Sequence, residues 1–223
     1  MATGYGKSLC FQFPSIYKLG ITICVCPLIS LMQDQVMKLN HQGICAGCLC
    51  SSQSYSRNKL IFDQAVNGEL KILYVTPEFV ESKFGELVLI NEKCPGGIVC
   101  FAIDEAHCVV QWGLHFRPSY SNIYKLRTIS DDIPFIAVTA TASPEERTNI
   151  IQKLKLRNPR VIVTSFDREN LFFEFKKRTD VLSDIKEMFR MNQILLIWSA
   201  LTCSWFMNHF KEFTHCKDIA VRF

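Results

Sequence analysis

The sequence predicts an α/β fold in which a parallel sheet is covered by helices on both faces. Two observations lead to this prediction: short apolar runs bounded by turn residues recur along the chain, and segments with helical spacing lie between them. Buried strands that alternate with helices are typical of parallel sheets. With 223 residues, of which 48% are hydrophobic and 21% charged, the chain is long enough for one substantial domain.

The expected strands and helices follow one another in a regular order. The strands are Ile21–Cys26, Ala46–Cys50, Lys71–Thr76, Ile98–Asp104, Phe135–Thr139 and Val161–Ser165. The helices are Leu28–Gln42, Ser54–Asn67, Pro77–Leu89, Tyr120–Ile129 and Pro144–Leu154. Because ligands of parallel sheets bind at the carboxyl ends of the strands, we expect the chemistry where strands pass into loops.

After Arg190 the composition changes to an aromatic-rich run, Ile194–Met207. This run is shorter than the ~20 residues that a membrane-spanning helix needs, so a buried strand or helix is favoured over a membrane anchor. We therefore expect a first domain over residues 1–184, a divergent tail over residues 185–223, and no membrane partner. The net charge of +4 permits a nucleic-acid partner without indicating one.

Most of the 11 cysteines lie within apolar runs, which is typical of small buried side chains. Cys45, Cys48 and Cys50 have a spacing that begins some zinc sites. A closed zinc site needs four ligands, and no second pair follows at a suitable distance. Because Cys48 and Cys50 also fit the alternation of a strand, the structural interpretation is favoured and zinc is the alternative.

Residues 2–8, with the sequence Ala-Thr-Gly-Tyr-Gly-Lys-Ser, are typical of a phosphate-binding loop. Glycines let such a loop turn its backbone N–H groups toward phosphate oxygens, Lys7 can reach the β- and γ-phosphates, and the Ser8 hydroxyl can bind Mg²⁺. Met1 stands where the strict pattern has glycine, so a surface turn before a helix is the alternative. The predicted ATP-binding residues are Thr3, Gly4, Gly6, Lys7 and Ser8.

The apolar run Ile98–Ile103 ends in two adjacent carboxylates, Asp104 and Glu105. In an ATPase, Asp104 would hold Mg²⁺ directly or through water, and Glu105 would orient and deprotonate the attacking water. The alternative is an acidic surface pair, which is common after strands. A phosphate loop followed by a strand with Asp-Glu, in this order, favours the ATP site.

Small residues follow another expected strand at Thr139, Ala140 and Thr141. Hydroxyl groups at this position can connect the acidic pair to residues that contact nucleic acid. Without such a role, the segment is a strand that leads into a helix capped by Ser143.

Together these motifs resemble the RecQ family of superfamily 2 DNA helicases, closest to the Werner type. Asp104–His107 and Thr139–Thr141 resemble helicase motifs II and III, and Met1–Gln12 resembles motif I of that branch, which accepts Met in place of the first glycine. The segments similar to motif Ia, motif Ib, the aromatic-rich loop and the closing segment of the first lobe are Cys26–Gln35, Tyr74–Glu78, Gln111–Tyr120 and Phe166–Leu171.

The resemblance implies a RecA-like lobe, truncated at its N-terminus, that binds ATP and Mg²⁺ and belongs to a 3′-to-5′ helicase. It implies work on single-stranded DNA and duplex junctions in nuclear repair, recombination and replication. His107 would relay contact between the ATP site and the DNA-facing loop, although a role as catalytic base is the alternative. The implied DNA-binding residues are Ser30, Thr76, Gln111, Trp112, Phe116 and Arg117.

The aromatic-rich loop also suits DNA on physical grounds. Trp112 and Phe116 offer ring faces on which bases can stack, and Arg117 adds attraction for phosphate. The alternative is that both rings belong to the core, since Trp and Phe bury large areas.

The sequence departs from the RecQ pattern at several positions. Leu114 and His115 stand where the family usually has His-Asp, and Glu169 replaces a usual proline. We also expect that the strand preceding motif I and the second motor lobe are missing. Two other functions therefore stay open: a non-catalytic module that binds nucleotide or DNA, and a P-loop ATPase unrelated to nucleic acid.

Overall fold

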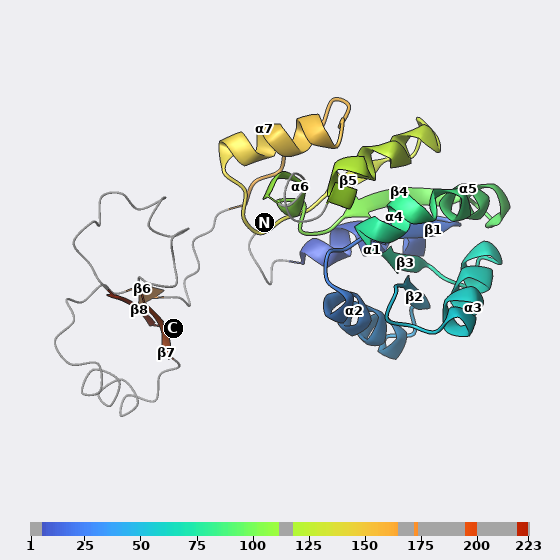
Figure 1. The fold of residues 1–223 in the computed structure, drawn as a ribbon, viewed down its shortest axis with the longest axis horizontal. Helices are drawn as coiled ribbons and strands as arrows, with labels where there is room; N and C mark the ends of the chain where they lie inside the picture. The colour runs from blue at the N-terminus through green and yellow to red at the C-terminus, as the bar shows by residue number, and fades with distance from the viewer. Residues whose placement is uncertain (1–5, 112–117, 165–171, 174–194, 200–217, 223) are drawn as a thin grey trace. The chain divides into compact units, whose positions relative to one another are not determined.

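A computed structural model describes residues 6–111 and 118–164, together with short strands at 172–173, 195–199 and 218–222 (Figure 1). The chain separates into two compact units, Met1–Thr164 and Ser165–Phe223. The domain boundary expected at residue 184 lies outside the described residues.

The first unit is built on a five-stranded sheet with the order β2-β3-β1-β4-β5. Every neighbouring pair in this sheet is parallel, which confirms the predicted α/β class. The strands are β1 (Ile21–Val25), β2 (Ala46–Leu49), β3 (Ile72–Val75), β4 (Ile98–Ile103) and β5 (Phe135–Ala137). Each lies within a run predicted from the sequence.

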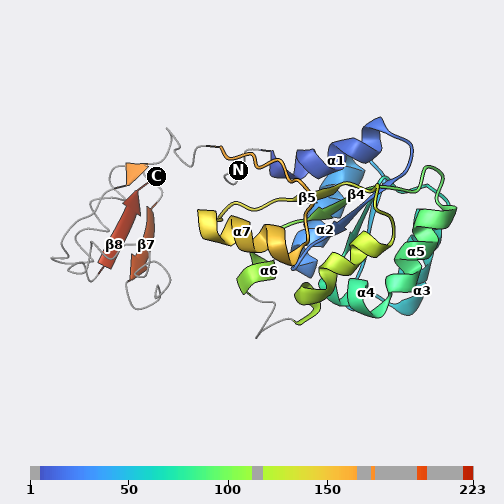
Figure 2. The same ribbon diagram turned by 90° about the horizontal axis from the view of Figure 1, so that it is seen from above.

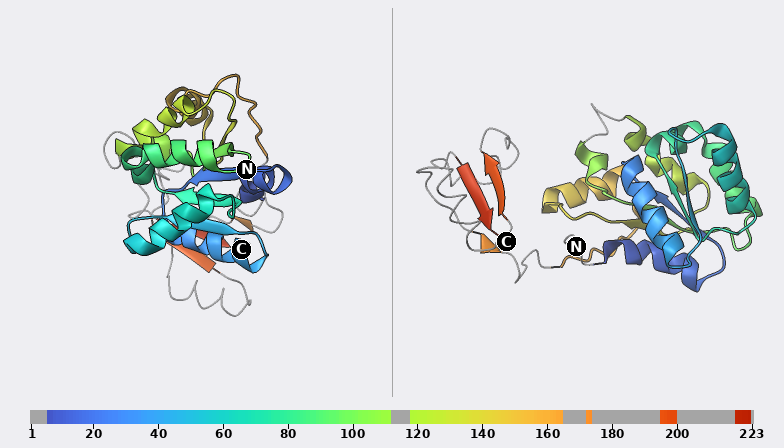
Figure 3. Two further views of the ribbon diagram at one scale, coloured as in Figure 1. Left: turned by 90° about the vertical axis from the view of Figure 1, so that its right-hand side faces the viewer. Right: turned by 90° about the horizontal axis from the view of Figure 1, so that it is seen from below.

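Helices cover both faces of the sheet, as Figures 2 and 3 show. One face packs against α1 (Lys7–Tyr17) and α2 (Ile29–His41). The opposite face packs against α3 (Tyr55–Val66), α4 (Pro77–Ser82), α5 (Phe84–Lys93), α6 (Cys108–Gln111), the 3₁₀ segment η1 (Pro118–Thr128) and α7 (Pro144–Lys153).

Strand alternation divides the core between these two faces. In β1, Ile21, Ile23 and Val25 belong to the core under α3–α7, whereas Cys24 and the following Cys26 belong to the core under α1 and α2. All five residues of β1 are buried, because the central strand of a doubly covered sheet meets helices on both sides. The apolar runs seen in the sequence are therefore strands buried on both faces.

The cysteines at positions 45–50 lie beside or within β2. Cys48 and Cys50 are each 4% exposed and pack in the core under α1 and α2, whereas Cys45 is exposed. Burial raises the pKa of the Cys48 thiol to about 11, which keeps it protonated at neutral pH. Cys48 and Cys50 are thus placed as core side chains, in line with the strand interpretation.

Two predicted helices differ from the structure. The segment Pro77–Leu89 holds two helices, α4 and α5, because Lys83 leaves helical geometry with φ −127° and ψ 32°. The segment Tyr120–Ile129 is helical, but it takes the tighter 3₁₀ form over Pro118–Thr128. Hydrophobic spacing alone does not distinguish these forms.

The predicted strand Val161–Ser165 is wrong over the described residues 161–164, which form no strand. Val161, Ile162 and Val163 are 54%, 69% and 53% exposed. β-branched residues favour a strand only where a neighbouring strand can accept and donate hydrogen bonds. Within the described part of the chain, β5 pairs with β4 alone, so residues 161–164 have no strand beside them.

The second unit contains a three-stranded antiparallel sheet with the order β6-β8-β7. Its strands are β6 (Phe172–Phe173), β7 (Leu195–Ser199) and β8 (Asp218–Arg222). β7 lies within the aromatic-rich run Ile194–Met207, and residues 194 and 200–207 of that run lie outside the described part. Among the described residues, no helix is long and apolar enough to cross a membrane.

Candidate nucleotide site

The start of α1 places the lysine of the predicted phosphate loop. Gly6 caps the helix with φ 79° and ψ 23°, a left-handed conformation that glycine adopts without steric cost. Nothing lies within 4 Å of the position that a Cβ of Gly6 would take, so backbone conformation rather than space selects glycine there. Lys7 is the first residue of the helix, while Thr3 and Gly4 lie outside the described residues.

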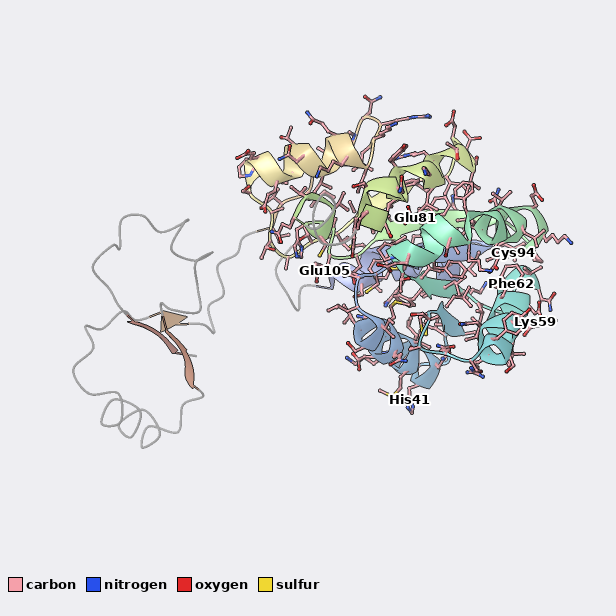
Figure 4. All side chains as sticks on the ribbon, viewed as in Figure 1. His41, Lys59, Phe62, Glu81, Cys94 and Glu105 are labelled. Carbon is pink, nitrogen blue, oxygen red and sulfur yellow. The ribbon has the colours of Figure 1, made fainter. Side chains whose placement is uncertain are left out.

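Lys7 meets the acidic pair that follows β4. Its Nζ atom lies 3.8 Å from Oε1 of Glu105, and the two side chains are 12% and 28% exposed. Figure 4 labels Glu105 in the loop beyond the end of β4. The structure thus brings together two predicted motifs that are about a hundred residues apart in the sequence.

Backbone hydrogen bonds hold the acidic pair at the carboxyl edge of the sheet. Asp104 donates its N–H to the Val25 carbonyl at 2.9 Å, and Ala106 donates to the Val138 carbonyl at 2.9 Å. Between them Glu105 has φ 48°, an uncommon conformation for a residue with a side chain. The Glu105 N–H donates to Oδ1 of Asp104 at 2.9 Å, which stabilises this turn.

Asp104 is a buried carboxylate, 5% exposed. Burial raises the pKa of its carboxyl group, and the neighbouring Glu105 carboxylate raises it further. The Glu105 N–H, Lys7 and His107 act in the opposite direction. Ionised Asp104 therefore carries a desolvation cost that a bound cation would offset.

His107 connects the acidic pair to the segment after β5. Its Nδ1 atom lies 2.9 Å from the Thr139 hydroxyl oxygen and 3.3 Å from Oε2 of Glu105. The Thr139 hydroxyl donates to the Thr141 carbonyl at 3.0 Å, and it accepts from the Thr141 N–H at 3.2 Å. Lys7, Glu105, His107 and Thr139 thus form one continuous set of contacts, and Ala140 lies in the turn between the two threonines.

Two glutamines of this region were not predicted from the sequence. Gln35 on α2 donates to the Ser8 hydroxyl at 3.4 Å, and Gln12 on α1 donates to Oε1 of Gln35 at 3.3 Å and to the Tyr74 hydroxyl at 3.5 Å. Burial raises the pKa of Tyr74 well above its usual range, so its hydroxyl stays neutral. Both glutamines lie in segments that resemble family motifs, and this was the signal that could have identified them.

The predicted DNA-binding residues that the structure describes follow the carboxyl ends of different strands. Ser30 is exposed in the first turn of α2. Thr76 is 8% exposed, and its hydroxyl accepts from the Phe79 N–H at 3.2 Å as the cap of α4. Gln111, at the end of α6, donates to Oε1 of Glu146 at 3.2 Å. Trp112, Phe116 and Arg117 lie outside the described residues.

Comparison with known proteins agrees with the motifs. Residues 1–150 match the model of the DEAD/DEAH box helicase family. The chain is 42% identical over 187 residues to the mouse bifunctional 3′-5′ exonuclease/ATP-dependent helicase WRN, covering 83% of this chain and 13% of that protein. It is also 42% identical over 180 residues to the Haemophilus influenzae ATP-dependent DNA helicase RecQ, covering 80% of this chain and 28% of RecQ.

Solved helicase structures share the fold at low sequence identity. The DUF1998 helicase MrfA matches with a TM-score of 0.61 and 19% identity over 95% of this chain and 35% of MrfA. The Pyrococcus furiosus Hef helicase domain matches with a TM-score of 0.50 and 18% identity over 70% of this chain and 33% of that domain. The curated relatives are much longer, since the chain spans 13% of the length of mouse WRN and 28% of that of Haemophilus RecQ.

Proposed function

The chain belongs to the RecQ family of DEAD/DEAH box helicases, and we propose that it supplies the nucleotide-binding lobe of a 3′-to-5′ ATP-dependent DNA helicase. One observation carries this proposal: Lys7 Nζ lies 3.8 Å from Glu105, whose other oxygen lies 3.3 Å from His107. A phosphate-binding lysine, an acidic pair and a link toward the segment after β5 are the parts that such an ATPase needs.

Ser8 and Asp104 suit a magnesium ion. Hydroxyl and carboxylate oxygens are the donors that Mg²⁺ prefers, and the desolvation cost of the Asp104 carboxylate is one that a divalent cation would offset. A magnesium ion bound with ATP neutralises charge that develops on the phosphate oxygens. Gln35 positions the Ser8 hydroxyl from the adjacent helix.

We assign Glu105 the role of acting on the attacking water. At 28% exposure its carboxylate is open to solvent, whereas Asp104 beside it is buried. In the proposed reaction Glu105 orients the attacking water and accepts its proton, and Lys7 draws the phosphate oxygens toward the same edge of the sheet. The catalytic set is therefore Lys7, Asp104, Glu105 and His107, with His107 in the relay role.

DNA would bind at the carboxyl edge of the sheet, close to this set. Ser30, Thr76, Gln111, Trp112, Phe116 and Arg117 are the proposed contacts, on single-stranded DNA and at duplex junctions. The relay runs from Glu105 through His107 to Thr139, Ala140 and Thr141. We assign the protein to repair, recombination and replication in the nucleus, on the strength of its resemblance to the Werner type.

A single substitution tests the nucleotide site. Lys7→Ala should weaken binding of a fluorescent ATP analogue about tenfold to a hundredfold, because a hydrogen bond from a charged group contributes about 1.5–3 kcal/mol. Lys18→Ala is the matched control, since Lys18 is an exposed lysine just beyond the other end of α1. Equal affinities for the wild type and Lys7→Ala would overturn the proposed site.

A further inference from the structure

A group of basic residues lies on two segments that the nucleotide site does not use. We call it the basic cluster, and it consists of Lys125, Arg127, Lys155, Arg157 and Arg160. Lys125 and Arg127 belong to η1, and the other three follow the end of α7. Residues 118–132 and 154–160 contain these five basic residues and two acidic residues, Asp131 and Asp132, so the two segments together carry a net charge of +3.

Ring contacts and an ion pair hold three of these cations in fixed positions. The Lys155 ammonium lies 4.0 Å from the centre of the Tyr124 ring, and the Arg157 guanidinium pairs with Asp131 at 2.7 Å. The first interaction joins the loop after α7 to η1, and the second joins this loop to the segment that follows η1. Arg127 lies over the Phe135 ring at 3.9 Å. Because all three side chains are already restricted, they give up less conformational entropy when they meet an anion.

The loop itself has a defined shape. Lys155 and Asn158 both have left-handed backbone conformations, with φ 50° and φ 44°, which residues with a side chain adopt infrequently. Lys155, Arg157 and Arg160 are all exposed. The three cations are therefore exposed to solvent on a loop with a defined backbone conformation.

Like charges in the cluster act on one another. The pKa of Arg127 is lowered first by burial and then by the nearby Arg157 guanidinium, and Asp131 offsets part of this effect. A ligand that brings several negative charges would relieve this repulsion at more than one point. A polyanion fits such a surface better than a single small anion does.

The basic cluster is separate from the nucleotide site. α7 begins directly after Thr141 and Ser143 at the carboxyl edge of the sheet, and it runs from Pro144 to Lys153. At a rise of about 1.5 Å per residue, the two ends of α7 are about 15 Å apart, so the loop after α7 begins about that far from Pro144. A ligand on the cluster would leave Lys7 and Glu105 free to act.

We propose that the basic cluster binds the phosphate backbone of DNA, at a position outside the path along the sheet edge. The proposal rests on the proposed function as a DNA helicase. Cations held in fixed positions suit sequence-independent contact with phosphates. Such a contact would hold duplex DNA beside the lobe while the sheet edge engages the single strand.

The test compares two variants of this chain that remove the same charge at different places. The cluster variant carries Lys155→Gln, Arg157→Gln and Arg160→Gln. The control carries Arg57→Gln, Lys59→Gln and Lys93→Gln, three exposed residues of α3 and α5 (Figure 4 labels Lys59). Binding of a fluorescein-labelled 20-base-pair duplex is followed by anisotropy from 50 to 200 mM salt.

The cluster variant should bind the duplex about 10- to 100-fold more weakly at low salt. Its slope of log K against log salt should be shallower by up to about 3, near 0.9 for each phosphate that the protein no longer neutralises. The control should stay close to wild type. Equal weakening in both variants, or unchanged binding by the cluster variant, would overturn the proposal. Polyglutamate that displaces the duplex as well as unlabelled DNA does would also overturn it, in favour of an acidic protein partner.

Nucleotide affinity measured on the same variants separates this proposal from the proposed function. The cluster variant should bind the fluorescent ATP analogue as the wild type does. Cluster-dependent DNA binding by a chain that shows no Lys7-dependent nucleotide binding would support the cluster and reject the ATP site.

Discussion

Asp104 illustrates how one residue can serve a site at the expense of stability. It is 5% exposed, and burial raises the pKa of its carboxyl group. A carboxylate with this environment is ionised at neutral pH only against a desolvation cost. The same burial favours a bound divalent cation, which would find a negative charge poorly solvated by water. The residue is thus better suited to the ligand-bound lobe than to the empty one.

Asp104→Asn should therefore stabilise the empty chain at pH 7, with a rise in melting temperature of about 2–4 °C for each kcal/mol gained. The asparagine keeps an oxygen that can accept from the Glu105 N–H and removes the buried charge. In the presence of Mg²⁺ and ATP the order should reverse, because ligand binds and stabilises the wild type preferentially. Thermal unfolding in EDTA and in Mg-ATP measures both effects.

The pH dependence of this difference has a defined sign. Because the folded state raises the pKa of Asp104, the folded wild type holds more protons than the unfolded chain above the ordinary carboxyl pKa of 3.8. The unfolding free energy of the wild type therefore falls, relative to that of Asp104→Asn, as pH rises from 3.8 through the raised pKa of folded Asp104. The unfolding free energies of the two chains converge toward lower pH. Asp34→Asn, on an exposed i,i+4 pair with Lys38, should show little change. A destabilised Asp104→Asn chain in EDTA would contradict this account.

At the scale of elements, the alternation of apolar runs with helical segments predicted most of the strands of the sheet. Capping side chains explain where several of the helices begin. β1 to β5 lie within the predicted runs because each is apolar and bounded by turn residues or helix caps. Ser54, Thr76 and Ser143 cap α3, α4 and α7 with their hydroxyl groups, which the residue types indicate in advance. The prediction of a strand at Val161–Ser165 failed because the composition of a segment does not show whether a neighbouring strand is available for hydrogen bonding.

α7 begins with a full capping box, and its removal should be measurable. The Ser143 hydroxyl accepts from the Glu146 N–H at 3.1 Å, and the Glu146 carboxylate accepts from the Ser143 N–H at 2.8 Å. Ser143→Ala should lower the unfolding free energy by about 1 kcal/mol, within the usual range of roughly 0.5–2 kcal/mol for removal of a cap. Urea unfolding at pH 7 provides the measurement.

The comparison for this prediction is Ser54→Ala, which removes a cap without a reciprocal bond. Ser54 accepts from the Arg57 N–H at 3.3 Å. We expect a smaller decrease in unfolding free energy for Ser54→Ala than for Ser143→Ala. The reason is that the Ser143 hydroxyl belongs to a reciprocal pair of hydrogen bonds, whereas the Ser54 cap is a single longer one. A Ser143→Ala chain as stable as the wild type would show that the box contributes nothing to α7.

At the scale of the whole molecule, the sequence indicated the chemical groups and the fold joined them. Lys7, Asp104 and Glu105 were predicted because their motifs carry residue types that phosphate and metal chemistry require. Thr139 was predicted because a small hydroxyl residue at a strand end can connect the acidic pair to residues that contact nucleic acid. The contacts between them depend on parallel strands that end at one edge, which the α/β prediction contains only in general form. Gln12 and Gln35 were not predicted because the amide side chain of a helical glutamine does not by itself indicate a role, and its hydrogen-bond partners are known only from the fold.

The 223-residue chain should bind nucleotide but hydrolyse it very slowly, and it should not separate duplex DNA. Among the described residues, no lysine or arginine other than Lys7 forms an ion pair with Asp104 or Glu105. Related phosphoryl-transfer enzymes use an additional arginine at the γ-phosphate, worth about 10³–10⁵ in rate, and a motor also needs two lobes that close on ATP and reopen. DNA-stimulated ATP hydrolysis and strand separation should be measured for this chain and for the same chain joined to the second lobe of a RecQ relative. The joined protein should gain both activities, and its Lys7→Ala form should lose them. Robust unwinding by the 223-residue chain alone would show that residues 165–223 supply what a second lobe supplies elsewhere.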